Sequence, residues 1–186
     1  MALSADAVTG YKAGTWQLDP THSDITFSVR HLAISKVKGK FEEFAVTAVT
    51  TDDPHATTVS ATIEIASVNT NQKDRDNHLR TSDFFEADKH PQMTFVSTSF
   101  EPEHGGDFLL KGDLTMKGIT KPVTLKGEFG GITTDGYGQV KAGVEATTKI
   151  NRHDFGVSWN AALEAGGLTL GDDVTINFDL QLVLQP

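Results

Sequence analysis

The sequence predicts an all-β protein, an eight-stranded antiparallel up-and-down β-barrel with one short inserted helix near the barrel mouth. First, apolar and polar residues alternate along most of the chain, as in antiparallel strands with one face in water. A sandwich also fits this alternation. Second, the strands follow one another as consecutive hairpins, which favours a barrel whose closure leaves no exposed edge. Third, only residues 69–96 break the strand pattern, so we expect one helical insertion there.

The composition suits a single folded unit. The chain has 186 residues, of which 38% are hydrophobic, enough for one sizeable core. Residues 1–13 have no apolar period, so we expect a flexible N-terminal arm followed by one barrel domain over 14–186.

Charge and residue usage exclude several classes of function. A formal net charge of −9 argues against nucleic-acid binding, and the absence of cysteine excludes disulfides and thiolate chemistry. The N-terminus shows neither a basic leader nor a long apolar run, so we expect no membrane span and a cytoplasmic protein. Removal of a leader would instead place the protein in the periplasm or outside the cell. The oligomeric state stays open, with a homodimer as one option.

The first half of the chain shows four stretches with strand character. A short strand is expected at 16–19. In the next, 24–32, one face carries Ile25, Phe27, Val29 and His31. Over 36–50 the apolar residues change from odd positions to even ones between Phe41 and Phe44, so we predict a bulge at Glu42 and Glu43. The fourth strand is expected at 56–66.

The second half continues the alternation through 92–101, 108–116, 121–129, 140–150 and 173–185. Asp135-Gly136 predicts a tight hairpin turn. About eight strands enclose an interior that is either filled by side chains or just holds one small ligand. The inward face of 140–150 includes Ala142, Val144 and Ala146, and its small side chains predict the wall of a ligand tunnel.

The insertion predicts a helix between about 72 and 82. Asn71 can cap its first turn with Asp74 reaching back, and Asp83 offers a second cap with Glu86. Leu79 is almost the only apolar residue in this helix, so we interpret the helix as a lid across the barrel. Phe84 and Phe85 are expected to point inward.

Catalytic and metal motifs do not stand out. The seven histidines lack the spacing of a metal site, and no nucleophile elbow or phosphate-binding loop is present. We therefore expect no catalysis, no metal and no cofactor. His31 lies on an inward face, and we interpret it as a satisfied core or pocket-rim residue in preference to a catalytic base.

Several segments together resemble the bacterial YceI-like family of polyisoprenoid-binding proteins. They are LDPTHSDITFSVRHL (18–32), KGKFEEF (38–44), RDNHLRTSDFFEADKHPQMTF (75–95), GDLTMKGITKPVTL (112–125), NRHDFG (151–156) and GDDVTI (171–176). The resemblance covers nearly the whole chain from Trp16 onward. It implies a lipocalin-like barrel with an elongated apolar tunnel that holds an isoprenoid quinone, a polyprenyl chain or a fatty-acyl molecule.

The resemblance also implies roles for single residues. Arg75 and Asp76 would lock the helix across the barrel mouth. The positions expected to face the lipid are Phe27, Val29, His31, Phe41, Phe44, His78, Leu79, Phe84 and Phe85. Two other functions stay open: an enzyme that uses His31 or His78 as base with Asp76 as its partner, and a solid-cored, stress-related barrel without a small ligand.

Overall fold

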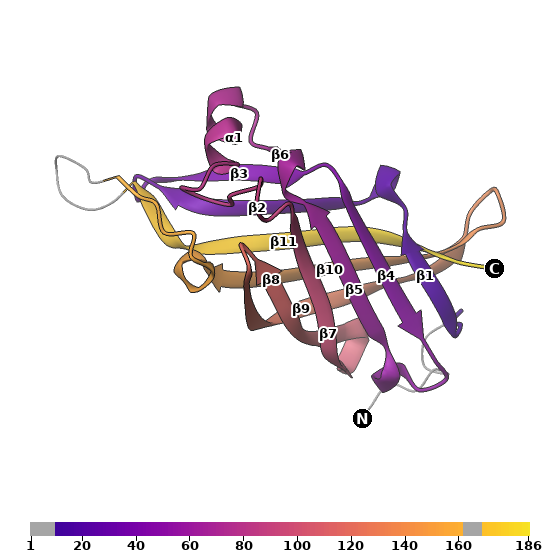
Figure 1. Cartoon of the computed structure of the whole chain (residues 1–186). Coiled ribbons are helices and arrows are strands. Elements are labelled where there is room, and N and C mark those ends of the chain that lie inside the picture. The colour runs from indigo at the N-terminus through magenta and orange to yellow at the C-terminus, as the bar shows by residue number, and fades with distance from the viewer. Residues whose placement is uncertain (1–9, 162–168) are drawn as a thin grey trace.

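The structure is a computed structural model that describes residues 10–161 and 169–186. Within these ranges the chain forms eleven strands and one α-helix, with short 3-10 turns between them (Figure 1). The strands are β1 (Gly14–Leu18), β2 (Asp24–His31), β3 (Ser35–Phe41), β4 (Phe44–Thr50), β5 (Thr58–Glu64), β6 (Val68–Asn69), β7 (Gln92–Pro102), β8 (Asp107–Met116), β9 (Ile119–Thr134), β10 (Val140–Asn151) and β11 (Leu170–Leu184). The helix is α1 (Lys73–Leu79).

The strands close into an antiparallel barrel with eight positions. The long strand β11 pairs with β10 on one side; on the other side it pairs first with β2 and then, near its C-terminal end, with β1. Strands β1 and β2 therefore share one position, β3 and β4 share the next, and β5 with β6 form the third. Strands β7 to β10 complete the ring in chain order. This confirms the predicted up-and-down barrel.

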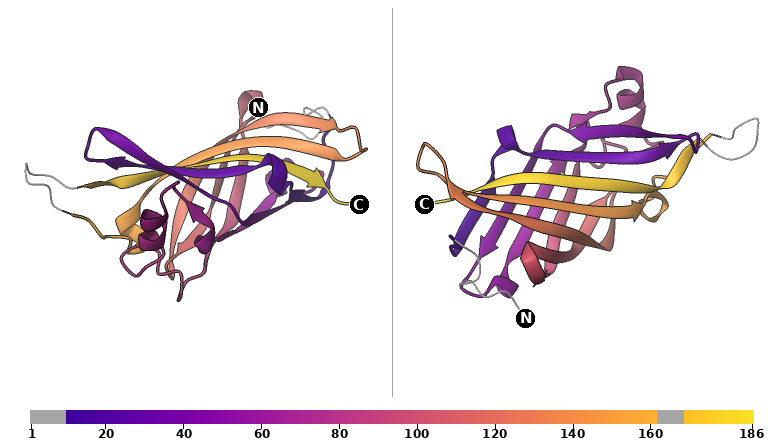
Figure 2. Two further views of the ribbon diagram at one scale, coloured as in Figure 1. Left: turned by 90° about the horizontal axis from the view of Figure 1, so that it is seen from above. Right: turned by 180° about the vertical axis from the view of Figure 1, so that it is seen from behind.

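The barrel is flattened, and its two walls cross at a steep angle. In Figure 1, β2, β3, β10 and β11 run across the view, whereas β1, β4, β5 and β7 run steeply through it. Helix α1 lies over β3 and β6, toward the end where the β2–β3 hairpin projects, and the β9–β10 loop lies at the opposite end (Figure 2).

The predicted bulge at Glu42 and Glu43 is wrong. The apolar residues do change from odd to even positions there, as expected, but no bulge within one strand causes the change. β3 ends at Phe41 and pairs with β2, whereas β4 starts at Phe44 and pairs with β1 and β5. The chain is therefore broken into two strands at this point. The backbone N–H of Glu42 donates to the carbonyl of Ser67 (3.2 Å), which holds the corner in place of ladder bonds.

A matching break separates β1 from β2, and Asp19 organises it. The carboxylate of Asp19 accepts hydrogen bonds from Lys141 Nζ (2.9 Å) and the hydroxyl of Thr21 (2.7 Å), and it pairs with His22 Nδ1 (2.9 Å). The bond from Lys141, followed by those from Thr21 and His22, holds the pKa of Asp19 well below its usual range. The break is thus pinned to β10 through Lys141.

The helical insertion is shorter than predicted, and its cap is a different residue. Gln72 is the N-cap, and its side-chain oxygen accepts from the N–H of Arg75 (2.6 Å). Asn71 does not take that role, because its backbone is left-handed (φ 65°) and an N-cap residue needs extended geometry. Its N–H is bonded to the side chain of Asn69 (2.8 Å). Asp83 caps no second helix; its carboxylate is bonded to His78 Nε2 instead.

One expected turn and part of the expected N-terminal arm can be compared with the structure. The β9–β10 hairpin is present, but Asp135 donates its N–H to the carbonyl of Gln139, and Gly138 rather than Gly136 takes the left-handed conformation. The turn is therefore longer than a two-residue turn.

Of the predicted arm, residues 1–9 lie outside the described ranges, and Tyr11 donates its hydroxyl to the carbonyl of Thr51 (2.6 Å).

Glycines on the inner face let aromatic rings lie flat across a neighbouring strand. A methyl group built on Gly39 would lie 2.4 Å from the ring of Phe27, and one on Gly127 would lie 2.0 Å from the ring of Phe108. Both pairs face each other directly in the ladder. The absence of a side chain at these positions therefore keeps the two rings against the wall of the barrel.

Candidate functional site

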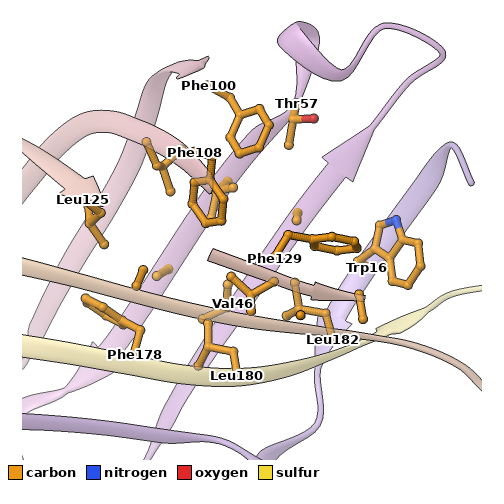
Figure 3. A pocket seen from close by; sticks show the side chains of 18 of the residues that line it. Trp16, Val46, Thr57, Phe100, Phe108, Leu125, Phe129, Phe178, Leu180 and Leu182 are labelled. Atoms are coloured by element: carbon orange, nitrogen blue, oxygen red, sulfur yellow. The ribbon is translucent and has the colours of Figure 1, made fainter. Parts of the chain in front are cut away.

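A cavity of about 600 Å³ lies inside the barrel, and its lining includes Trp16 on β1 and Ile132 on β9. Side chains from both walls point into it (Figure 3). Its surface is mostly apolar, and aromatic rings contribute much of it. Examples are Trp16, Phe100, Phe108, Phe129 and Phe178, with Val46 and Leu182 between them.

A second cavity of about 420 Å³ lies at the end covered by α1. Strands β2 and β3 form one side of it, and the helix with the turn that follows closes another. Its wall combines apolar residues with polar ones. His31, His78 and Arg152 are among the polar groups.

The two cavities adjoin. Met93 on β7 and Ile176 on β11 line both of them. Along β11, the inward row passes from Leu170 in the second cavity through Ile176 to Leu182 in the first. At about 3.3 Å per residue this row spans roughly 40 Å. Together the cavities offer space for a long, narrow apolar molecule.

The predicted ligand-facing residues divide between the two cavities. Ala142 and Val144 line the first. Eight others line the second: Phe27, Val29, His31, Phe41, His78, Leu79, Phe84 and Phe85. Phe44 lines neither; it begins β4 beside the break at 42–43 and packs against the hydrophobic core. The contact of these residues with a ligand stays a prediction.

Helix α1 is tied to the end of β6 through one threonine. Asp76 is buried, and its carboxylate accepts from both the N–H (2.9 Å) and the hydroxyl of Thr70. Arg75 donates from Nε to the hydroxyl of Thr70 and from Nη2 to its carbonyl, each at 2.7 Å. These bonds tie the helix to Thr70 directly after β6, and the locking of the helix across the barrel mouth by this pair stays a prediction.

His78 is the histidine that the structure couples to a carboxylate at the cavity. Its Nε2 lies 2.8 Å from Asp83 Oδ2, and its ring packs edge-on against Phe84 and Trp159. Asp76 was the partner considered in the sequence, but its carboxylate is committed to Thr70. If His78 acts as a base, the carboxylate that orients it is therefore that of Asp83.

Sequence reasoning missed much of the first cavity. Phe95 and Phe100 both face inward although their numbers differ in parity, because β7 carries an irregularity between Ser97 and Ser99. A similar shift in the β9–β10 ladder turns Ile132 inward as well as Phe129. At both irregularities the apolar residues change between odd and even positions, as they do between Phe41 and Phe44, so the sequence carried a signal for them.

Within 10–161 and 169–186, no group of three or more His, Cys, Asp or Glu side chains is arranged to hold a metal ion. The described part of the chain also contains no helix long and apolar enough to cross a membrane. The expected absence of a metal stays a prediction, which elemental analysis of protein purified without a metal-affinity tag can test.

Comparison with known proteins places the chain in a family. The family model described as "YceI-like domain" matches residues 16–182. A UPF0312 protein of Staphylococcus aureus (strain MSSA476) is 42% identical over 159 residues, which cover 84% of this chain and 90% of that protein. The crystal structure of the Campylobacter jejuni YCEI protein is 32% identical, with a TM-score of 0.70 over 84% of this chain and 90% of that one.

A more distant structure shares the fold. A polyisoprenoid binding domain from Saccharophagus degradans, implicated in plant cell wall breakdown, is 16% identical and superposes with a TM-score of 0.70, covering 94% of this chain and all of that one. The family match spans the barrel from β1 nearly to the end of β11, so the chain belongs to the YceI-like family.

Proposed function

We propose that the protein binds a long apolar lipid of the isoprenoid type inside the barrel and thereby stores, transports or shields it. The ligand classes that fit are an isoprenoid quinone, a polyprenyl chain and a fatty-acyl molecule. The observation that carries the proposal is the pair of adjoining, mainly apolar cavities along the barrel. Each cavity falls within the range of about 300–1,000 Å³ that is usual for small-molecule sites.

The physical driving force is the removal of the chain from water. Burial of apolar surface is worth about 25 cal/mol per Å², so a narrow apolar tube binds a long hydrocarbon with few polar contacts. The polyisoprenoid binding domain of Saccharophagus degradans has the same fold, which supports a lipid ligand for this chain. A solid-cored barrel is disfavoured, because tightly packed interiors leave few voids larger than a water molecule.

An enzyme acting on such a lipid is the second candidate. The pairing of His78 with Asp83 beside the second cavity favours it, since an oriented histidine can act as a base. Turnover of a bound lipid that is abolished by His78→Gln would support this candidate over simple binding.

The direct test is extraction of the natively purified protein with organic solvent and identification of the extract by mass spectrometry. We expect one predominant long-chain lipid in near-stoichiometric amount. An extract without lipid, together with no binding of added polyprenol, quinone or fatty acid to the delipidated protein, contradicts the proposal.

A substitution on β10 tests where the lipid lies. Ala142 is buried on the wall of the first cavity, so the indole of Ala142→Trp takes space that the lipid would occupy. We expect a melting temperature near that of delipidated wild type and copurification with little or no lipid. In a packed interior the same change would strain the core by about 1–3 kcal/mol. Glu145→Trp, on the exposed face of the same strand, is the matched control and should keep its lipid.

A further inference from the structure

The turn between β2 and β3 exposes two large apolar side chains close together. Leu32, Ala33 and Ile34 form this turn, which we call the hairpin tip, between the paired residues His31 and Ser35. The hairpin projects from the end of the barrel that α1 covers (Figure 2). Leu32 is 37% exposed, and Ile34 is 81% exposed, more than any other large aliphatic residue that the structure describes. Single exposed apolar residues are ordinary, but two in one projecting turn form a small apolar patch.

The backbone of the hairpin tip is left-handed at two residues that are not glycine. The φ angle is 55° at Leu32 and 58° at Ala33. The N–H of Ile34 donates to the carbonyl of His31 (3.3 Å), and the N–H of Leu32 donates to the carbonyl of Thr169 (2.8 Å), so the turn is anchored at its base. Asparagine and glycine adopt the left-handed conformation at lower cost. The turn therefore keeps a leucine where its own stability would favour asparagine or glycine, which indicates a role outside the fold.

The outer face of the hairpin behind this tip is basic. Arg30 on β2 lies opposite Lys36 on β3, and the alternation along β3 places Lys38 and Lys40 on the same face. We call these four exposed residues the basic strip. Residues 25–41 contain no Asp or Glu, although acidic residues outnumber basic ones by 25 to 16 in the whole chain. A positive surface thus stands out on a protein with a net charge of −9.

Neighbouring carboxylates compensate these charges only in part. Lys40 Nζ lies 3.7 Å from Glu42 Oε1, and the other members of the basic strip form no ion pair within the described residues. On the neighbouring strand β11, Asp172 and Asp173 are exposed, and Asp172 is bonded to His153 Nε2 (2.8 Å). The basic strip therefore keeps positive charge that an anionic surface outside the chain would neutralise.

The inner face of the same hairpin lines the second cavity. Its contributions are Phe27, Val29, His31, Val37 and Phe41. The hairpin tip and the basic strip thus belong to a wall whose other side borders space inside the barrel.

An anionic membrane fits this combination better than a macromolecule does. Lipid phosphates attract Lys and Arg, and an apolar tip gains by entering the boundary between head groups and acyl chains. A nucleic acid would use the basic strip and leave the apolar tip in water. A stable protein interface buries about 800 Å² on each partner around an apolar centre, more than a tip with two large apolar side chains supplies.

We propose that the β2–β3 hairpin docks the protein on a bilayer that contains anionic phospholipid, with the hairpin tip among the head groups and the basic strip against the phosphates. Docking brings the wall of the second cavity to the membrane, so that a lipid passes between bilayer and barrel with little exposure to water. The docking is independent of the proposed function, whereas the transfer of a lipid rests on it.

The first experiment measures cosedimentation of the purified protein with vesicles. One set consists of phosphatidylcholine alone, and the other contains about one third phosphatidylglycerol. We expect strong binding to the anionic vesicles alone, weakened about tenfold or more between about 0.05 M and about 0.5 M NaCl because salt screens the attraction. Equal binding to both sets, no binding to either, or binding that does not respond to salt overturns the proposal.

Substitutions in the basic strip test the electrostatic part. The triple variant Arg30→Gln, Lys36→Gln and Lys38→Gln should bind anionic vesicles about tenfold or more weakly, because each basic residue near such a surface contributes about fivefold. The matched control removes the same number of charges from exposed lysines outside the hairpin: Lys12→Gln, Lys121→Gln and Lys126→Gln. Equal losses in both triple variants mean that net charge alone governs binding, which overturns the docking site.

Substitutions in the hairpin tip test the apolar part without loss of stability. The variant Leu32→Asn, Ala33→Gly and Ile34→Ser removes the apolar side chains and supplies residues suited to the left-handed backbone. We expect a melting temperature at or above that of wild type and vesicle binding weakened by about tenfold. Val96→Ser, at an exposed apolar residue of β7, is the control and should bind as wild type does. A stable tip variant with undiminished binding overturns the insertion of the tip.

Uptake of a fluorescent fatty acid separates docking from lipid binding. The delipidated wild type and both hairpin variants receive it either in solution or in anionic vesicles. We expect equal uptake from solution, and uptake from vesicles that is about tenfold slower in the variants. Equal rates from vesicles overturn transfer through the docked hairpin. A wild type that docks but takes up no lipid from either source loses the proposed function and keeps the docking site; uptake from solution without docking has the opposite meaning.

Discussion

Single polar side chains hold the barrel where its strands are interrupted. At the break between β1 and β2, the hydroxyl of Ser23 donates to the carbonyl of Asp19 and accepts from the N–H of Gln181 on β11. The carboxylate of Asp19 adds the link to Lys141 on β10. These bonds replace the ladder bonds that the break removes, and the link to Lys141 depends on ionised Asp19.

The effect of pH on this corner can be predicted. Because the pKa of Asp19 is lowered in the folded protein, its contribution is complete above the unfolded pKa of about 3.9 and is lost as the pH falls further toward the folded pKa. We expect Asp19→Asn to lower the melting temperature by about 2–6 °C at pH 7, because charge-assisted hydrogen bonds are lost. The difference from wild type should shrink as the pH falls below about 4.

The control for this measurement is Asp24→Asn, which changes an exposed carboxylate at the start of β2. Its melting curve should follow that of wild type throughout the pH range. A gap for Asp19→Asn that stays constant or widens in acid would mean that the carboxylate does not stabilise the corner through its charge.

At the scale of the strand, glycines decide how much of the interior stays open. Gly39 on β3 lies directly opposite Phe27 on β2, and Gly127 on β9 lies opposite Phe108 on β8. The rings occupy the space that a side chain would take, so they lie along the wall instead of across the lumen. Phe27 lines the second cavity and Phe108 the first, so each pair keeps part of a cavity open.

We expect Gly39→Ala to push the ring of Phe27 into the second cavity, since the new methyl group would lie 2.4 Å from it. The free energy of unfolding should drop by about 1–3 kcal/mol, the usual cost of overpacking, and less lipid should copurify. Urea denaturation and lipid analysis measure the two effects. Gly143→Ala on β10 is the control, because nothing lies within 4 Å of its added methyl group. Equal behaviour of the two variants would contradict the role given to the Phe27–Gly39 pair.

On the scale of the whole molecule, ligand and fold are coupled. The barrel surrounds two cavities of about 600 and 420 Å³ that its own side chains leave open. Unfilled space deprives the surrounding side chains of dispersion contacts. A lipid that occupies it adds those contacts to the folded state alone, so binding must raise the stability of the entire barrel.

The size of this coupling can be predicted. Free ligand at one hundred times its Kd stabilises the folded state by about 2.7 kcal/mol. For a chain of this length the melting temperature should rise by roughly 5–11 °C. Differential scanning calorimetry of delipidated protein with and without added lipid measures the rise. The same lipid should leave the melting temperature of Ala142→Trp nearly unchanged, and an equal rise in both proteins would place the lipid outside the first cavity.

The sequence by itself determined the class of fold, the chain order of the strands and the place of the helical insertion. These features follow from local patterns in the sequence. Apolar residues at every second position, as at Ile25, Phe27 and Val29, indicate a strand with one buried face. The loss of this alternation indicates the helical insertion. Most residues predicted to face a ligand line a cavity for the same reason, because an inward position in a closed barrel faces the lumen.

Only the tertiary structure decided what the inward faces enclose. Whether Ala142 borders packed atoms or open space depends on how far apart the two walls lie, which no single strand encodes. The inward turn of Ile132 depends on an irregularity between two paired strands, and the pairing of His78 with Asp83 depends on how the turn after α1 folds back. Arg152 looked like one charge in a loop motif; its burial against three carbonyls, with one nitrogen left over, arises only when β10 and β11 meet at the end of the barrel.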